Sequence, residues 1–214
     1  MYDISNGKVH TKAVTPYAVS TEKTLDITVK TQEYDNGCWA ACTEALINYK
    51  YNSMSATEQN AIKKATKETY PVTQTAIMTY IHGEDSDKAG DVNDMANALN
   101  HFLNITRSTE MYKGYTGSAK TYSAMVTKIK VGKPVILAGE HTVGSVTTKH
   151  AMLCYGYDDS NSKELKLFVQ SPTTKGTKNY TLVCSDKNAT TYDVYENGKK
   201  TGTYSVSGFV NGGK

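Results

Sequence analysis

The apolar residues of this chain are spaced differently in its two halves, and this difference limits the folds that it can adopt. Before residue 110 they recur at helical spacing in several stretches. After residue 110 one further helical stretch is followed by short runs that alternate apolar and polar residues, separated by Asn-Gly and Thr-Gly turns. Helices that precede antiparallel strands predict an α+β fold, because a parallel sheet would need strands and helices in alternation.

The individual elements follow from capping residues, helix breakers and alternation. We expect helices at residues 38–50, 56–67 (opened by a capping box of Ser55 and Glu58), 73–81, from Asp91 or Asn93 to Phe102, and 122–131. We expect strands at residues 25–30, 105–112, 134–138, 150–157, 165–170, 192–195 and 203–206. The polar composition of residues 139–149 is typical of a loop.

The length of the chain fits one domain. Its 214 residues can bury a full core but are few for two domains of ordinary size. Neither an internal repeat nor a linker divides the sequence. We therefore expect a single domain over residues 1–214, with an N-terminal extension (1–24), a mainly helical part (25–110) and a mainly β part (111–214), and we expect it to be a monomer.

Charge and hydropathy argue against two classes of partner. The net charge is +3 without a run of basic residues, which argues against nucleic acid. Nothing approaches the roughly 18 consecutive apolar residues of a membrane span.

The first thirty residues also lack the apolar stretch of a signal peptide, which a cytosolic protein would explain. The 16 tyrosines and many Thr, Ser and Asn are instead typical of secreted bacterial proteins, so we expect an extracellular protein whose leader is not part of this sequence.

Cys38 is the strongest candidate for a reactive residue. It opens a predicted helix within the stretch Gly37-Cys38-Trp39, and a helix N-terminus lowers the pKa of a thiol. Gly37 lets a substrate backbone approach the sulfur without a side chain in the way. Gln32, six residues upstream, can direct its amide N–H to the same point as the backbone N–H of Cys38. Together these groups predict a nucleophile with an oxyanion hole.

His150 is the candidate base for this nucleophile. It begins the apolar run HAMLCYGY, and we expect it at the edge of the sheet, near solvent, where a proton-exchanging group is useful. Within hydrogen-bond reach it would hold Cys38 as a thiolate–imidazolium pair. His141 is the weaker candidate, because it lies in the predicted polar loop.

The stretch QEYDNGCWAAC resembles the active-site sequence of papain-like cysteine peptidases. The glutamine, the six-residue step to cysteine and the Cys-Trp pair that opens a helix all match. The later order of GKPVIL, HAMLCYGYDD and a strand that ends before proline resembles the compact bacterial branch, which includes double-glycine-leader peptidases and papain-like effector proteases. The similarity covers roughly residues 25–173. It implies a papain-like fold, a protein or peptide substrate, and the roles of nucleophile for Cys38, proton shuttle for His150 and oxyanion donor for Gln32.

The residue that orients the histidine departs from this family. The bacterial relatives commonly have Asp before the proline and papain has Asn, whereas this chain reads Gln170-Ser171-Pro172. Alignment on the proline selects Ser171, which strand parity places on the same face as Leu165, Leu167 and Val169. Gln170 is the closer chemical substitute for Asn. Neither supplies a charge to an imidazolium, so the resemblance implies a slower enzyme or a weaker ion pair.

The remaining cysteines and histidines predict no metal site and no cofactor. A C-x3-C spacing on a helix, as in Cys38 and Cys42, is not a usual zinc clamp, and no second Cys/His pair follows. We expect Cys42 and Cys154 to be buried or free thiols and Cys184 to be a surface or strand thiol.

Three functions remain open at this point. The first is a cysteine endopeptidase that forms a thioester on Cys38. The second is a Cys-dependent acyl or amide transferase, which would pass the same acyl group to an amine. The third is a binding or adhesion module on a papain-like scaffold, which the missing Asp or Asn and the turn-rich last forty residues favour.

Overall fold

The computed structural model describes residues 21–83, 87–107, 110–117 and 120–212. Most of the expected N-terminal extension therefore lies outside the described residues. The helices are α1 (Cys38–Asn52), α2 (Ala56–Thr66), α3 (Gln74–His82), α4 (Val92–Phe102) and α5 (Tyr122–Lys130). The strands are β1 (Glu22–Thr24), β2 (Tyr112–Thr116), β3 (Val135–Val143), β4 (Val146–Asp158), β5 (Leu165–Thr173), β6 (Gly176–Cys184), β7 (Thr191–Glu196) and β8 (Lys199–Gly212).

Polar side chains cap four of these helices at their N-termini. The capping box of Ser55 and Glu58 at the start of α2 is confirmed, with Ser55 accepting from the Glu58 backbone N–H and Glu58 accepting in return. Asp91 opens α4 in the same way. Helix α1 differs, because its cap is Gly37, which has no side chain to bond the first N–H groups. Those N–H groups are therefore available near Cys38.

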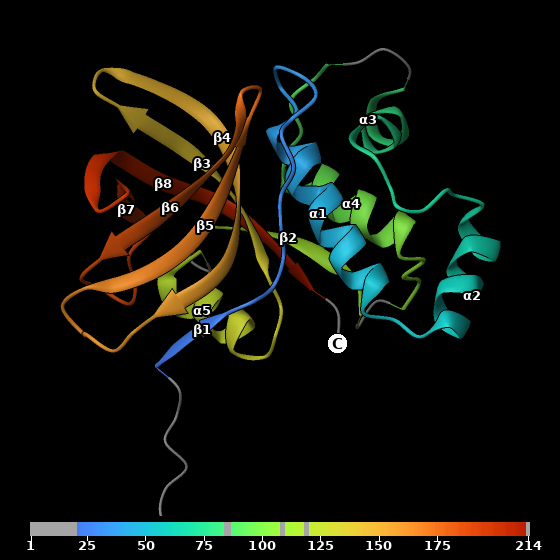
Figure 1. Ribbon diagram of the computed structural model, residues 1–214, viewed down its shortest axis with the longest axis horizontal. Helices are drawn as coiled ribbons and strands as arrows, with labels where there is room; N and C mark the ends of the chain where they lie inside the picture. Colours follow the sequence, from blue (N-terminus) through green and yellow to red (C-terminus); the bar gives the residue numbers. More distant parts are fainter. Residues whose placement is uncertain (1–20, 84–86, 108–109, 118–119, 213–214) are drawn as a thin grey trace, which may run out of the picture.

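The six long strands β3 to β8 form an antiparallel barrel. Their order is β4-β3-β8-β7-β6-β5, and β5 pairs again with β4 to close the ring. Figure 1 shows this barrel beside the group of helices α1 to α4, with α5 below it. The prediction of helices followed by antiparallel strands is confirmed, although the closure of the sheet into a barrel was not part of it. The short strands β1 and β2 extend the sheet by pairing with β4 and β8.

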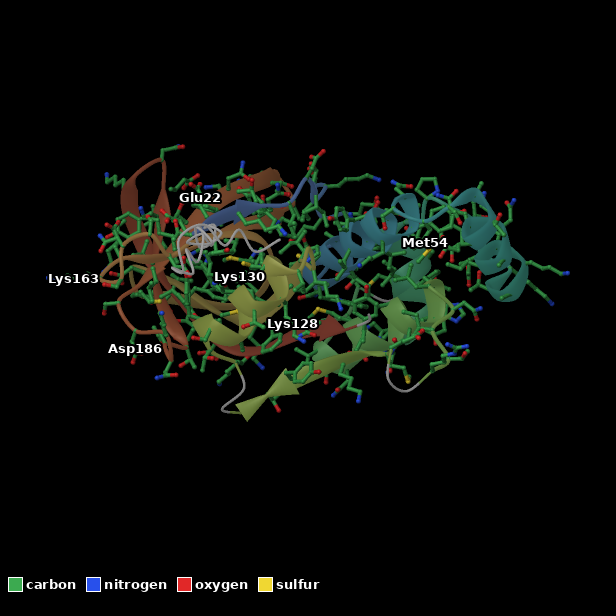
Figure 2. The ribbon with its side chains drawn as sticks, turned by 90° about the horizontal axis from the view of Figure 1, so that it is seen from below. Glu22, Met54, Lys128, Lys130, Lys163 and Asp186 are labelled. Atoms are coloured by element: carbon green, nitrogen blue, oxygen red, sulfur yellow. The ribbon has the colours of Figure 1, made fainter. Side chains whose placement is uncertain are left out.

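Two apolar cores meet at the wall formed by β3, β4 and β8. Residues of these strands that face outward, such as Ile136, Ala151 and Leu153, pack with helices α1 to α4. The alternate residues, such as Leu137 and Met152, fill the barrel interior together with α5. Seen from below, the two parts lie side by side, with Met54 in the helical part and Lys128 and Lys130 on α5 beneath the barrel (Figure 2).

The prediction of a polar loop at residues 139–149 is wrong. These residues continue β3 and β4 into a hairpin that pairs from Val135↔Cys154 to Val143↔Val146. Gly144, with φ of 60°, forms the tight turn. Threonine has a high strand propensity, so a polar composition here does not interrupt the pairing. His141 consequently lies within a strand.

Two expected strands are also displaced. Residues 25–30 keep the alternating burial that was predicted, with Ile27 and Val29 buried, but they form no strand. The strand expected at 105–112 begins instead at Tyr112, whose backbone N–H and C=O are both bonded by the side chain of Asn100. Side chains thus bond backbone groups of Ile27, Val29 and Tyr112, and alternation alone cannot predict such bonds.

Candidate active site

Cys38 lies at the junction of the helical part and the barrel. It is the first residue of α1, as expected, and its Sγ accepts a hydrogen bond from the backbone N–H of Ala151 on β4 at 3.4 Å. The turn before it is compact: the N–H of Gly37 donates to the carbonyl of Tyr34, and a Cβ at position 37 would lie 3.0 Å from the same oxygen. A larger residue at position 37 would therefore require this turn to shift slightly. The thiol bonds to the peptide that joins His150 to Ala151.

His150 and Ser171 approach each other where β4 and β5 separate. These strands pair between Leu153↔Gln170 and Asp158↔Lys166, and beyond Leu153 they no longer bond to each other. The ring nitrogen Nε2 of His150 lies 2.8 Å from Oγ of Ser171. Ser171 has the strand parity of the barrel-facing Val169, as predicted. In the described part of the chain the other ring nitrogen, Nδ1, has no hydrogen bond.

The surroundings of His150 differ from the expected solvent-exposed sheet edge. It lies within β4 rather than at its start, because β4 begins four residues earlier, and it is partly buried at the end of the barrel. Burial, assisted by the positive charge that His141 can carry, lowers the pKa of His150 to about 4. The imidazole is therefore neutral at pH 7 and can accept a proton.

The thiol of Cys38 is also neutral in the free protein. Burial raises its pKa above the ordinary value, against the lowering effect of the backbone N–H groups of Ala151, Trp39 and Cys38 itself. The expected lowering by the helix N-terminus is thus outweighed, because β4 and the helical core cover the sulfur. The structure favours a neutral thiol and imidazole over the expected ion pair.

Gln32 lies on the loop that leads to Cys38, but its amide is used within that loop. The side chain is 9% exposed, and its Nε2 donates to the carbonyls of Tyr34 (2.8 Å) and Asp35 (3.0 Å). The carboxylate of Asp87 accepts from the backbone N–H of Asp35 and of Asn36 and braces the same turn. An oxyanion role for Gln32 therefore requires one of its N–H groups to turn toward the substrate.

Gln170 is turned away from His150 and holds the segment before Gln32. Its Oε1 accepts from the N–H of Val29 at 2.6 Å, and its Nε2 donates to the carbonyl of Ile27 at 3.2 Å. Thr177 also donates to the carbonyl of Val29. The amide takes the place of a neighbouring strand for residues 27–29. Of the two candidates, only Ser171 bonds to the histidine.

We predict that Gln170→Ala destabilises the fold more than it affects chemistry. Val29 is 1% exposed, so the substitution leaves its N–H buried without a partner, which costs about 2–3 kcal/mol in the free energy of unfolding. Urea denaturation checks this value. Lys166→Ala on the same strand removes only partly exposed ion pairs and is expected to change stability by less than about 1 kcal/mol. Equal losses in the two variants would contradict the bracing role.

Two further side chains lie near His150: His141, the weaker candidate base, and Tyr204, which the sequence did not single out. The ring of His141 stands edge-on to Tyr180 and Tyr204, and its Nε2 is buried without a hydrogen bond. Tyr204, on β8, is fully buried and donates its hydroxyl hydrogen to the carbonyl of His150 at 2.8 Å. Only the pairing of β8 with β3 and of β3 with β4 brings Tyr204 here, so a single sequence cannot reveal it.

Trp39 and the four cysteines were also considered from the sequence, and the structure shows the surroundings of each. Trp39 is 1% exposed and its indole N–H donates to the carbonyl of Lys88. All four cysteines are free thiols, with Cys42 and Cys154 buried, as predicted. Among the described residues no group of three His, Cys, Asp or Glu side chains is placed to hold a metal ion. In the same residues no helix is long and apolar enough to cross a membrane.

Comparison with known proteins assigns the chain to a family. No curated protein matches the chain by sequence. The family model described as the Peptidase_C39 like family matches residues 24–203, a span that includes Gln32, Cys38, His150 and Ser171. This match covers most of the chain and agrees with the resemblance seen in the sequence, so the chain belongs to the Peptidase_C39 like family.

Proposed function

We propose that the chain is a cysteine endopeptidase that hydrolyses peptide bonds through a thioester on Cys38. The observation that carries this proposal is the contact of the Cys38 thiol with the peptide that joins His150 to Ala151, at the start of a helix whose cap residue, Gly37, has no side chain. The hydrogen bond between His150 and Ser171 adds an orienting partner of the kind that a catalytic histidine needs. The helical part packed on an antiparallel barrel also supports the papain-like architecture.

The first step is attack by sulfur on the carbonyl carbon of the substrate. In the tautomer that this requires, Nε2–H of His150 donates to Ser171 Oγ and the lone pair of Nδ1 takes the proton of the thiol. The carbon–sulfur bond forms as the carbonyl π electrons move to oxygen. Because both groups start neutral, the proton moves with the attack, and no stored thiolate is needed.

The negative oxygen that results needs hydrogen-bond donors. The backbone N–H of Cys38, at the first position of α1, is one, and the helix dipole adds to it. Gln32 supplies the second when one of its N–H groups exchanges the loop carbonyl for the oxyanion. The imidazolium then gives its proton to the leaving nitrogen as the carbon–nitrogen bond breaks. Water, deprotonated by the neutral His150, hydrolyses the thioester and restores the thiol.

Incubation of the protein with a mixture of unblocked and blocked peptides tests the proposal. We expect internal peptide bonds to be cleaved, and acid quenching to trap an acyl adduct whose mass maps to Cys38. Products carrying an added amine in place of water would identify a transferase. A folded protein that retains peptides without cleaving them, and without forming the adduct, would overturn the proposal in favour of a binding module.

A further inference from the structure

Tyr204 crosses a neighbouring strand to reach the backbone of His150. Its hydroxyl donates to the carbonyl oxygen of His150 at 2.8 Å and lies 3.3 Å from the carbonyl oxygen of Leu137. Strand β8, which carries Tyr204, pairs with β3, and β3 pairs with β4. The tyrosine side chain therefore spans the whole of β3 inside the barrel, where it is fully buried.

The sequence of β3 makes room for this side chain. Gly139 is the register partner of His150, and the register of β3 with β8 shifts between Ala138 and Gly139. A Cβ at Gly139 would lie 2.9 Å and 3.0 Å from two ring atoms of Tyr204 and 2.3 Å from the carbonyl oxygen of Ser205. The glycine and the irregular register thus bring the hydroxyl to the level of His150.

The carbonyl that Tyr204 bonds belongs to the same peptide unit as the N–H that bonds the nucleophile. The carbonyl of His150 accepts from Tyr204, and the N–H of Ala151 donates to Sγ of Cys38. In a trans peptide these two groups point in opposite directions, so a chain of hydrogen bonds runs from the barrel interior to the thiol. A donor on the carbonyl polarises the amide and strengthens its N–H as a donor.

We propose that Tyr204 is a positioning residue for the nucleophile: its hydroxyl fixes and polarises the His150–Ala151 peptide, whose N–H stabilises the Cys38 thiolate as it forms. This role serves the proposed peptidase reaction. The chain of hydrogen bonds from Tyr204 to Cys38, here called the link, exists in the free protein, so its effect on the thiol is measurable without a substrate. Burial, together with the thiols of Cys42 and Cys38, raises the pKa of Tyr204 well above its ordinary value. The hydroxyl therefore remains a donor across the pH range in which the thiol is studied.

Four other titratable side chains surround this link, and the test leaves all of them in place. Cys42 lies one turn along α1, His150 lies on β4, and His141 on β3 faces the ring of Tyr204. Lys178 on β6 acts in turn on His141. A substitution of the Tyr204 hydroxyl alone removes none of these charges, so a change in thiol acidity reports the hydroxyl.

The experiment compares Tyr204→Phe with Tyr192→Phe in the alkylation of Cys38 by iodoacetamide across pH, read by mass spectrometry. Tyr192 is a matched control, because it is also buried in the barrel and donates its hydroxyl hydrogen to a carbonyl, that of Ala189, at 2.9 Å. We expect Tyr204→Phe to raise the titration midpoint of Cys38 and to slow labelling below the midpoint about two- to fivefold. Tyr192→Phe is expected to label like the wild type.

Two results would overturn the proposal. One is wild-type labelling in Tyr204→Phe, or equal changes in both phenylalanine variants. The other is loss of the Tyr204→Phe effect in a His150→Ala background, because that background keeps the peptide and removes only the imidazole. Peptide cleavage does not enter this readout, so an inactive protein still decides the question.

A second variant keeps the test decisive if Tyr204→Phe does not fold. Site-specific replacement of Tyr204 by 3-fluorotyrosine preserves the hydroxyl and makes it a stronger donor. We expect the titration midpoint of Cys38 to move down, opposite to the phenylalanine variant. A midpoint that moves up or stays unchanged would contradict the link through the peptide.

Discussion

Cys38→Ala is expected to abolish peptide hydrolysis, with kcat/KM lowered by about 10⁴- to 10⁶-fold. The sulfur is the atom that bonds to the substrate in the proposed mechanism, and no other nucleophile in the described residues lies at the start of α1. The loss should fall on kcat, because the substitution removes one side-chain atom and leaves the surface that binds peptides. Initial rates of cleavage of the best substrate from the peptide mixture measure the effect.

Cys42→Ala is the matched control for this prediction. Cys42 lies one turn further along α1 and is fully buried, and burial raises the pKa of its thiol well above the ordinary value. We expect its removal to cost about 1 kcal/mol of stability and to leave hydrolysis within a few-fold of wild type. Persistent cleavage in Cys38→Ala, or loss of cleavage in Cys42→Ala alone, would assign the nucleophile elsewhere.

The position of Cys38 could be predicted because its signals are local. A glycine followed by an alanine- and leucine-rich stretch is enough to begin a helix, and α1 starts at the expected residue. The parity that places Ser171 with Leu165, Leu167 and Val169 is equally local, since it depends only on alternation along one strand. Such features need no knowledge of what lies across the fold.

The environment of His150 could not be predicted, because it depends on how β4 pairs with other strands of the sheet. The length of β4 is set by its pairing with β3, which continues through residues that look like a loop. The closure of β5 onto β4 then turns the expected sheet edge into the end of a barrel. The partial burial of His150 follows from this closure, whereas Cys38 packs against the helical core and β4. The shift from an expected ion pair to a neutral pair is therefore a tertiary effect.

The roles of Gln170 and Tyr204 also depend on contacts between residues that are far apart in the sequence. Gln170 bonds to Val29, 141 positions away in the sequence, and Tyr204 bonds to His150, 54 positions away. Nothing in the local sequence of either residue predicts the backbone group that its side chain bonds. For Gln170 this means that chemical likeness to asparagine was a weaker guide than position along the strand.

The low pKa of His150 predicts that acid destabilises the folded protein before it protonates the histidine. In the native state the pKa is about 4, whereas in the unfolded chain it is near 6.5. As the pH falls through 6.5, the unfolded chain binds a proton that the native protein does not. The free energy of unfolding should therefore decrease between about pH 6.5 and pH 4, by up to about 3 kcal/mol from this group.

His150→Gln tests this contribution with the amide in place of the ring. The variant should lose hydrolysis by about 10²- to 10⁴-fold, because the proton acceptor is gone. Its stability should also fall less steeply than that of wild type between pH 6.5 and 4, whereas above pH 7 the two pH dependences should be parallel. Urea titrations at several pH values measure both curves, and equal slopes below pH 6.5 would show that His150 is not held neutral by the fold.

The burial of His150 also determines the pH at which activity is lost in acid. In the free enzyme His150 must be neutral to accept the thiol proton, so kcat/KM should persist to about pH 5 and decline around pH 4. An ordinary, solvent-exposed histidine would place that decline near pH 6.5. A pH profile on one peptide therefore distinguishes a base buried at the end of the barrel from one at an open sheet edge. A decline near pH 6.5 in a protein that remains folded would mean that β4 and β5 open in solution and return the imidazole to water.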